Sequence, residues 1–193
     1  YLDKDPFLLY KAKSVKTELV YLTQEELMKL ENYQFDIKRV EAIKDCFVFC
    51  CYTGLAFKEM SNLRIEHIVK GYDGMDWIMM KRQKTQKNLA IPLLPKALQI
   101  IDKYANNKGQ VLPVLSNARF NAYLKEIADI LGIRKRLTHH VARRTFASTV
   151  LLYNNVPMEI VSELLGHSKL TTTQQSYGKI VQRKVGEAMK LLQ

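Results

Sequence analysis

The stretch THHVARRTFAST, Thr138–Thr149, places two histidines and two arginines at the start of an apolar segment. If the segment is helical, His140 and Arg143 lie three residues apart on one face. The apolar residues that follow can anchor that helix in the core. Its cationic first turns, together with the free N–H groups of a helix start, would then bind an anion. A structural interpretation competes with this one, in which Arg143 pairs with a core carboxylate and His140 takes no part in chemistry.

A second group of polar residues lies in LLGHSKLTTTQQSYGKI, Leu164–Ile180. His167 follows Gly166, where a helix is expected to end, and Tyr177 stands ten residues after His167. We expect the threonine-rich segment between them to be a polar loop, from which a tyrosine hydroxyl could move into a site as a nucleophile. The alternative is an ordinary surface aromatic side chain.

The third group lies in KRQKTQKNLAIP, Lys81–Pro92, which is typical of a β-hairpin with Lys84 at its tip. Because side chains alternate between the two faces of a strand, Arg82 and Lys84 share a face. With Lys81 and Lys87 beside them, the tip is a cationic finger suited to a nucleic-acid groove. Solvated lysines on a surface turn are the alternative.

The overall charge favours an acidic partner. The 193 residues include 30 Lys and Arg against 19 Asp and Glu, a formal net charge of +11. Such a surplus indicates nucleic acid, for which the affinity falls steeply with salt. The sequence has no membrane-spanning apolar run and no signal-peptide pattern at its start. Cys46, Cys50 and Cys51 lack the spacing of a metal site, so we expect reduced core thiols in a cytoplasmic protein.

The elements that must position these groups are mainly helices around one small sheet. Thr23 and Glu26 form a capping box at a helix start, and Gly54 is suited to end an all-round apolar helix over 39–52. Three strand-like stretches follow, and after Pro95 the pattern is helical again. The strands are expected over 63–69, 76–84 and 88–93, and the later helices over 96–106, 117–131, 140–154, 157–165 and 179–192.

The order of these motifs resembles the catalytic domain of the tyrosine recombinase family, the integrases of phages and mobile elements. The chain has a hairpin lysine, then H-x-x-R, then L-G-H, then a tyrosine near the C-terminus, and Tyr52–Leu63 (YTGLAFKEMSNL) is similar to the family's first box. The resemblance implies an α+β, mainly helical fold with a small three-stranded antiparallel sheet. It also implies that residues 1–20 are a linker following a core-binding domain, and that residues 21–193 are the catalytic domain with a C-terminal tail helix.

The resemblance implies a role for each candidate residue. Tyr177 would attack a DNA phosphodiester and form a 3′-phosphotyrosyl link. Arg143 would clamp the non-bridging oxygens, while His140 and His167 would donate hydrogen bonds to the phosphate or assist proton transfer. Lys84 would protonate the leaving 5′-oxygen. The energy of the phosphodiester is retained in the protein–DNA bond, so the implied reaction needs no metal ion, cofactor or ATP.

The chain departs from the family pattern at its first box. The family has an arginine after T-G-L that forms half of the phosphate clamp, and this chain has Ala56 there. Arg82 is our preferred replacement because it shares a strand face with Lys84. Arg64 and Arg39 are weaker candidates, since one is expected to begin a strand and the other a helix. The step of ten residues from the L-G-H histidine to the tyrosine is also one longer than is usual in the family.

The expected partner is double-stranded DNA, contacted by Arg144, Lys81 and Lys87 in addition to the catalytic residues. We expect a homo-tetramer on DNA and a monomer when free, with accessory DNA-bending proteins as possible further partners. No membrane contact is expected, and the expected location is the bacterial cytoplasm, at the nucleoid. The amphipathic tail helix after Tyr177 can pack on its own core or on a neighbouring subunit. Two other functions stay open: a DNA-binding architectural relative with a decayed site, and a type IB topoisomerase-like enzyme.

Overall fold

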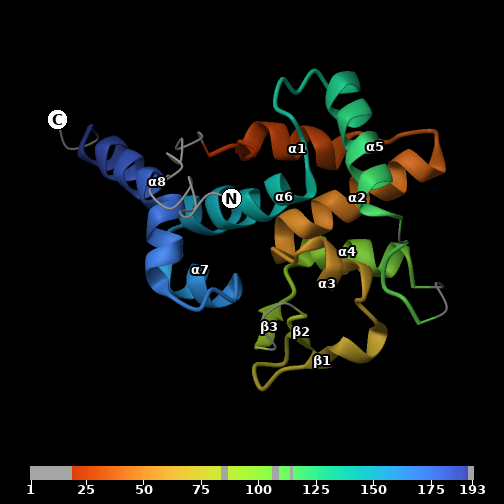
Figure 1. Cartoon of the computed structure of the whole chain (residues 1–193), viewed down its shortest axis with the longest axis horizontal. Helices are drawn as coiled ribbons and strands as arrows, with labels where there is room; N and C mark the ends of the chain where they lie inside the picture. The colour runs from red at the N-terminus through yellow and green to blue at the C-terminus, as the bar shows by residue number, and fades with distance from the viewer. Residues whose placement is uncertain (1–18, 84–86, 106–108, 114, 191–193) are drawn as a thin grey trace, which may run out of the picture.

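The structure is a computed structural model that describes residues 19–83, 87–105, 109–113 and 115–190 (Figure 1). Helices form most of it, and one small sheet lies at one end of the helical body. This arrangement confirms the predicted α+β, mainly helical class. The α-helices are α1 (Gln24–Asn32), α2 (Lys38–Thr53), α3 (Phe57–Ser61), α4 (Pro95–Lys103), α5 (Asn117–Ile130), α6 (His139–Thr145), α7 (Met158–Leu164) and α8 (Leu170–Lys190).

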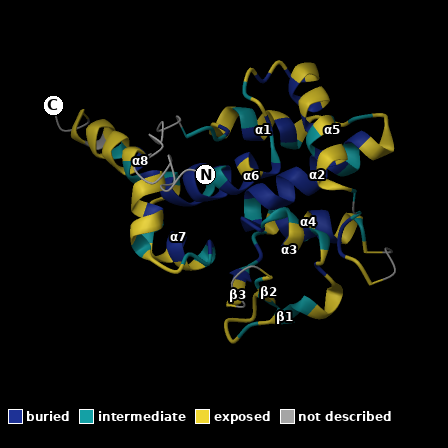
Figure 2. Cartoon of the chain, viewed as in Figure 1, coloured by how far each residue is buried: buried dark blue, intermediate teal, exposed yellow. Residues whose placement is uncertain are grey.

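Helix α2 is the centre of the core. Apolar side chains are buried all around it, and α1, α4, α5 and α6 pack against it (Figure 2). It ends at Gly54, whose φ of 65° makes a left-handed C-cap. The capping box of Thr23 and Glu26 at the start of α1 is also present. Both helices and their end signals are therefore confirmed.

The sheet has the order β1-β2-β3, all antiparallel, with strands β1 (Ile68–Lys70), β2 (Asp76–Lys81) and β3 (Asn88–Pro92). The strand predicted from residue 63 was wrong over its first half, because Ile65–His67 form a 3-10 turn. The Arg64 N–H donates to Nδ1 of His67 at 3.0 Å, and the His67 N–H donates back to the Arg64 carbonyl at 3.0 Å. In a β-strand, these backbone N–H and C=O groups would instead form hydrogen bonds with a neighbouring strand.

The helix predicted over 140–154 is present but is not regular. Helix α6 passes into a π-helical segment, Phe146–Leu151, and then into a 3-10 turn, Leu152–Asn154. The Leu22 N–H, from the chain before α1, donates to the Thr145 hydroxyl at 2.9 Å. The Thr149 hydroxyl donates in turn to the Leu22 carbonyl. Tertiary hydrogen bonds thus join this part of the chain to the residues before α1.

The helices predicted over 96–106, 117–131 and 157–165 correspond to α4, α5 and α7.

The largest difference from the sequence-based prediction is at α8. We expected a polar loop around Tyr177 and a helix only from residue 179, but Leu170–Lys190 form one continuous helix. Its buried face consists of Thr173, Tyr177 and Ile180, spaced as one stripe of a helix. The other residues that indicated a loop, Thr171, Thr172, Gln174 and Gln175, lie on the exposed side. These side chains are polar because they face solvent, and the segment is helical all the same.

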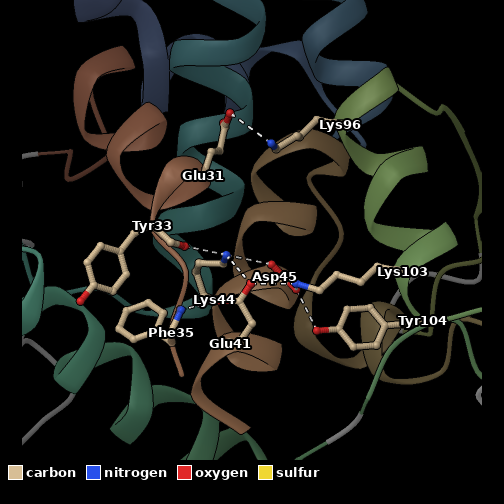
Figure 3. Close-up of polar contacts among 9 residues, drawn as sticks. All are labelled: Glu31, Tyr33, Phe35, Glu41, Lys44, Asp45, Lys96, Lys103 and Tyr104. Atoms are coloured by element: carbon tan, nitrogen blue, oxygen red, sulfur yellow. Dashed lines mark hydrogen bonds and ion pairs between the residues drawn. The ribbon is translucent and has the colours of Figure 1, made fainter. Parts of the chain in front are cut away.

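A buried polar network holds the first half of α2 (Figure 3). The Lys44 side chain is 4% exposed, and its ammonium lies 2.8 Å from the Glu41 carboxylate and 3.2 Å from that of Asp45. It also donates to the carbonyl of Tyr33 at 2.9 Å. Lys103 on α4 lies 2.7 Å and 2.6 Å from the same two carboxylates. The network therefore joins the α1–α2 connection and α4 to the central helix.

Three further features bear on function. The cysteines Cys46, Cys50 and Cys51 are free and buried in α2, as predicted. Among the described residues, no helix is long and apolar enough to cross a membrane. The same part of the chain has no cluster of three or more His, Cys, Asp or Glu side chains that could hold a metal ion.

Candidate active site

Arg143 lies where the ends of three helices meet. It sits on α6, is 7% exposed, and its guanidinium donates to the carbonyl of Gly54 at the end of α2 and to that of Leu165 after α7. Two of the five N–H donors of an arginine are used in this way, which leaves the rest of the fork for an anion. Burial, and then the nearby charge of Arg82, lower the pKa of Arg143 to about 10. The guanidinium stays protonated at neutral pH and is rigidly held.

Arg82 approaches the same place from the sheet. It follows β2, and its Nη1 donates to the carbonyl of Gly166 at 2.7 Å. Leu165 and Gly166 are consecutive, so neighbouring carbonyls at the end of α7 hold one guanidinium each. A Cβ on Gly166 would lie 3.2 Å from Nη1 of Arg82, and the φ of Gly166 is +60°. The glycine of the L-G-H motif therefore permits both the turn and the close approach of Arg82.

Glu59 is a member of this site that the sequence analysis missed. It lies on α3 inside the Tyr52–Leu63 motif, is 3% exposed, and its Oε1 is 3.5 Å from Nε of Arg82. Its Oε2 is buried without a hydrogen-bond partner among the described residues. The available signal was a carboxylate between the apolar residues Phe57 and Met60 of that motif. The buried charge orients Arg82 beside Arg143.

His167 lies in the turn between α7 and α8. Its Nδ1 is 2.7 Å from the hydroxyl of Thr173, a fully buried residue in the first turn of α8. Burial, then Arg143, then Arg82 lower the pKa of His167 to about 4. The imidazole is therefore neutral at neutral pH and lies within the field of both guanidiniums. Thr173 had no individual signal in the sequence, where it was one of three consecutive threonines.

The two histidines of the H-H-x-x-R stretch have different environments. His139 is 6% exposed and stacks edge-on against Phe57 at 5.5 Å between ring centroids. His140 is on the exposed side of α6. Burial, then Arg144 and Arg143, lower the pKa of His140, while burial is also the main reason that the pKa of His139 falls to about 4. Only His140 is accessible to a bound anion.

Tyr177 packs against this group from α8. Its side chain is 5% exposed and lies in a small apolar cluster with Phe146, Leu165 and Ile180. Burial raises the pKa of the Tyr177 hydroxyl, and Arg143 and Arg144 oppose that rise. Tyr177 shares its apolar cluster with Leu165, whose carbonyl accepts a hydrogen bond from Arg143. The structure thus brings together residues that are 95 positions apart, from Arg82 to Tyr177.

The other candidates in the described part of the chain lie apart from this group. Lys81 ends β2 and Lys87 precedes β3, and both are exposed, while Lys84 lies outside the described residues. The weaker arginine candidates are placed elsewhere: Arg39 lies 5.7 Å above the ring of Tyr123, and Arg64 is bridged to the loop at Gln110.

The chain resembles proteins of one family over most of its length. The phage integrase family model matches residues 21–183. The tyrosine recombinase XerA of Pyrococcus furiosus is 30% identical over 205 residues, covering 98% of this chain and 67% of that protein. The chain spans 56% to 61% of the length of three other curated tyrosine recombinases that it matches.

Two solved structures share the fold. The crystal structure of XerA recombinase superposes with a TM-score of 0.69 at 21% identity, covering 88% of this chain and 65% of that one. The XerH site-specific recombinase, bound to its difH substrate in a pre-cleavage complex, has a TM-score of 0.65 at 22% identity. That match covers 86% of this chain and 52% of XerH. At these identities the likeness establishes the fold alone.

Proposed function

The chain belongs to the phage integrase family, and from this membership we propose that it is the catalytic domain of a site-specific DNA recombinase. The proposed reaction cleaves and rejoins DNA through a 3′-phosphotyrosyl intermediate. One observation carries the proposal: consecutive carbonyls after α7 hold Arg143 and Arg82 together, beside His167 and the helix of Tyr177. Two guanidiniums match a phosphodiester in charge and geometry, and a tyrosine beside them supplies a nucleophile.

In the proposed cleavage step, the Tyr177 oxygen attacks the phosphorus of the scissile phosphodiester. The bond from phosphorus to the 5′-oxygen breaks, and that oxygen takes up a proton as it leaves. Rejoining reverses the step, with a 5′-hydroxyl attacking the phosphotyrosyl ester. Because the ester retains the energy of the broken bond, the cycle requires neither a metal ion nor ATP.

Arg143 and Arg82 would share the work of stabilising the phosphorane. Their donors would contact the non-bridging oxygens, where negative charge increases in the transition state. This role for Arg82 supplies what an arginine at position 56 would otherwise provide. Its hydrogen bond to Gly166 and its contact with Glu59 support the assignment, because they hold the side chain in place before substrate arrives.

The proton transfers are assigned by chemistry and by the family pattern. Lys84 is the proposed acid that protonates the leaving 5′-oxygen. His167 is neutral because its pKa is about 4, so it is suited to donate a hydrogen bond without adding charge. His140 would do the same from the exposed side of α6. Burial raises the pKa of Tyr177, so its hydroxyl is protonated at neutral pH, and as the oxygen attacks the phosphorus its proton would pass to the neutral imidazole of His140 or to water.

The partner proposed for the domain is duplex DNA, with Arg144, Lys81 and Lys87 contacting the backbone. A solved relative of the same fold, XerH, is bound to its DNA substrate. We further propose that residues 1–20 are the linker from a core-binding domain and that the protein acts at the bacterial nucleoid. Of that linker, residues 1–18 lie outside the described part of the chain.

Assembly into a homo-tetramer on DNA is proposed from α8. The second half of this helix projects from the molecule in Figure 1, and Val185 and Met189 are 57% and 56% exposed. An apolar stripe on a projecting helix is suited to dock on a second copy of the chain. The first half of α8, with Tyr177 and Ile180, packs on its own subunit, and the proposed docking on a second copy concerns the second half only.

The test of the proposed function uses the full-length protein and a nicked DNA substrate that carries the element's end. We expect a covalent protein–DNA complex on a denaturing gel, which Tyr177→Phe abolishes and Tyr153→Phe preserves. If the protein binds the DNA and gives no covalent band, it is an architectural relative with a decayed site. Relaxation of supercoils without strand exchange between two duplexes would instead indicate a topoisomerase.

A further inference from the structure

The contact between His167 and Thr173 connects two parts of the site that lie six residues apart. Thr173 is fully buried, and its hydroxyl oxygen is 2.7 Å from Nδ1 of His167. A buried, β-branched threonine has little rotamer freedom, so the hydroxyl is held at that position. Within the described residues, this is the hydrogen bond that orients the ring of His167.

The direction of this hydrogen bond decides what His167 offers to a ligand. A neutral imidazole carries one proton, on either Nδ1 or Nε2. If the hydroxyl accepts from Nδ1–H, then Nε2 presents a lone pair. If the hydroxyl donates to Nδ1, then Nε2 carries the proton and becomes a donor. The lone pair would be repelled by the phosphate that two neighbouring guanidiniums attract, whereas the N–H would bind it.

We propose that Thr173 is a positioning residue that donates its hydroxyl proton to Nδ1 of His167 and thereby fixes the Nε2–H tautomer facing the scissile phosphate. This inference rests on the proposed function, since the phosphate is the group that selects the tautomer. The low pKa of His167 agrees with it, because a neutral ring needs a partner to choose between its two tautomers.

The same contact links His167 to the nucleophile. Thr173 and Tyr177 are four residues apart on α8 and share its buried face. A helix transmits position rigidly over one turn, so the bond to His167 sets where Tyr177 lies relative to the histidine. Thr173 therefore aligns the hydrogen-bond donor and the nucleophile on the same phosphate.

The experiment compares Thr173→Val with Thr173→Ser in the full-length protein. Valine has the same shape without the hydroxyl, and serine keeps the hydroxyl. We expect Thr173→Val to slow covalent-complex formation roughly 10- to 100-fold, the scale known for partners that orient a functional histidine in metal sites. Thr173→Ser should remain within about 3-fold of the parent, and both variants should bind DNA with parental affinity.

Two readouts separate this role from a merely structural one. Nitrogen-15 NMR of His167 should show Nε2–H in the parent and a mixture of tautomers in Thr173→Val. On the background of His167→Gln, adding Thr173→Val should cause no further loss of rate, because the residues act through one another. Thermal unfolding of each variant reports whether a loss of rate reflects a loss of folding.

The outcomes that overturn the inference are distinct from failure of the proposed function. A parental rate in Thr173→Val, or a parent in which His167 carries its proton on Nδ1, rules out the positioning role. A parent without any covalent complex would instead refute the proposed function. The NMR measurement would still decide the direction of the hydrogen bond in that case.

Discussion

Ala56 stands where the family pattern has an arginine, and Arg82 is the residue that we propose takes over its role. Position 56 is the N-cap of α3 and carries no donor, while Arg82 is anchored by the carbonyl of Gly166 and by Glu59. A positive charge supplied from a strand end can take the place of one supplied from a helix start if both reach the same phosphate. The site would then differ from that of its relatives in the origin of one guanidinium and not in its chemistry.

Replacement of Arg82 tests this exchange. We expect Arg82→Ala to lower the rate of covalent-complex formation roughly 10²- to 10³-fold, the usual effect of removing one preorganised donor from a transition state. Arg82→Lys should recover little of the rate, although it keeps a charge beside Glu59, because an ammonium lacks the planar fork. Arg64→Ala is the matched control and should cleave normally. Parental cleavage by Arg82→Ala would rule out the exchange.

His139 makes the stability depend on pH. Its pKa is about 4 in the folded protein against an ordinary 6.5, so the unfolded chain takes up the proton first as the pH falls. Stability is therefore complete above pH 6.5 and is lost as the pH decreases toward 4. At pH 5 the loss from this residue is about 2 kcal/mol.

Urea unfolding of the parent and of His139→Phe, at pH 7.5 and at pH 5, measures that loss. A phenylalanine side chain cannot be protonated, so the variant should not lose this contribution at low pH. Relative to the parent, its unfolding free energy should therefore be about 2 kcal/mol more favourable at pH 5 than at pH 7.5. An unchanged difference would mean that His139 titrates normally in the folded state.

At the scale of elements, the junction of α2 and α6 is critical for the site. Gly54 ends α2 at a φ of +65°, and a Cβ there would lie 2.3 Å from the ring of Phe146. Its carbonyl accepts a hydrogen bond from Arg143. One residue thus combines a helix end, a close packing contact and a hydrogen-bond acceptor for Arg143, the proposed catalytic arginine.

Gly54→Ala should therefore affect both stability and activity. A positive φ costs about 1 kcal/mol in a non-glycine residue, and overpacking against Phe146 adds about 2 kcal/mol more. Gly74→Ala is the control: its φ is +76°, but no atom lies within 4 Å of an added Cβ. Chemical unfolding should show a loss of roughly 3 kcal/mol for the first and about 1 kcal/mol for the second. Equal losses would mean that the ring of Phe146 moves aside with no cost in unfolding free energy.

At the scale of the whole molecule, the two halves of α8 have different surroundings. Its first half closes over Arg143 with Thr173, Tyr177 and Ile180, while its second half projects with an exposed apolar stripe (Figure 1). Since the halves belong to one helix, docking of the stripe on another subunit would restrain the position of Tyr177. Assembly of subunits would then influence where the proposed nucleophile, Tyr177, lies.

Val185→Asp tests the proposed role of the stripe. The side chain is 57% exposed, so the variant should keep the thermal stability of the parent monomer. We expect it to bind a single DNA site normally and to fail to form higher complexes in analytical ultracentrifugation with paired sites. Gln182→Asp, on an exposed position of the same helix, controls for the added charge. Normal assembly by Val185→Asp would exclude the stripe as the interface.

Much of this protein follows from sequence alone, because local physics determines it. The capping box at Thr23, the apolar helix that ends at Gly54 and the alternation of the strands are set by spacing within a few residues. The family was identified differently, by the resemblance of the order H-x-x-R, L-G-H and a distal tyrosine to a known family, which is visible without a fold.

Three features could not be predicted from periodicity, and tertiary structure decided the first and the third. Tyr177 lies on a buried helix and not in a loop, because a helix with one apolar stripe is stabilised by the core it covers and not by its polar side. The turn at Ile65–His67 replaced a strand through a side-chain contact that strand periodicity does not encode. The anchoring of Arg82 by Gly166 and Glu59, and of His167 by Thr173, joins residues whose meeting depends on packing between elements. Sequence spacing identifies such groups one at a time, and only the folded chain brings them to a common site.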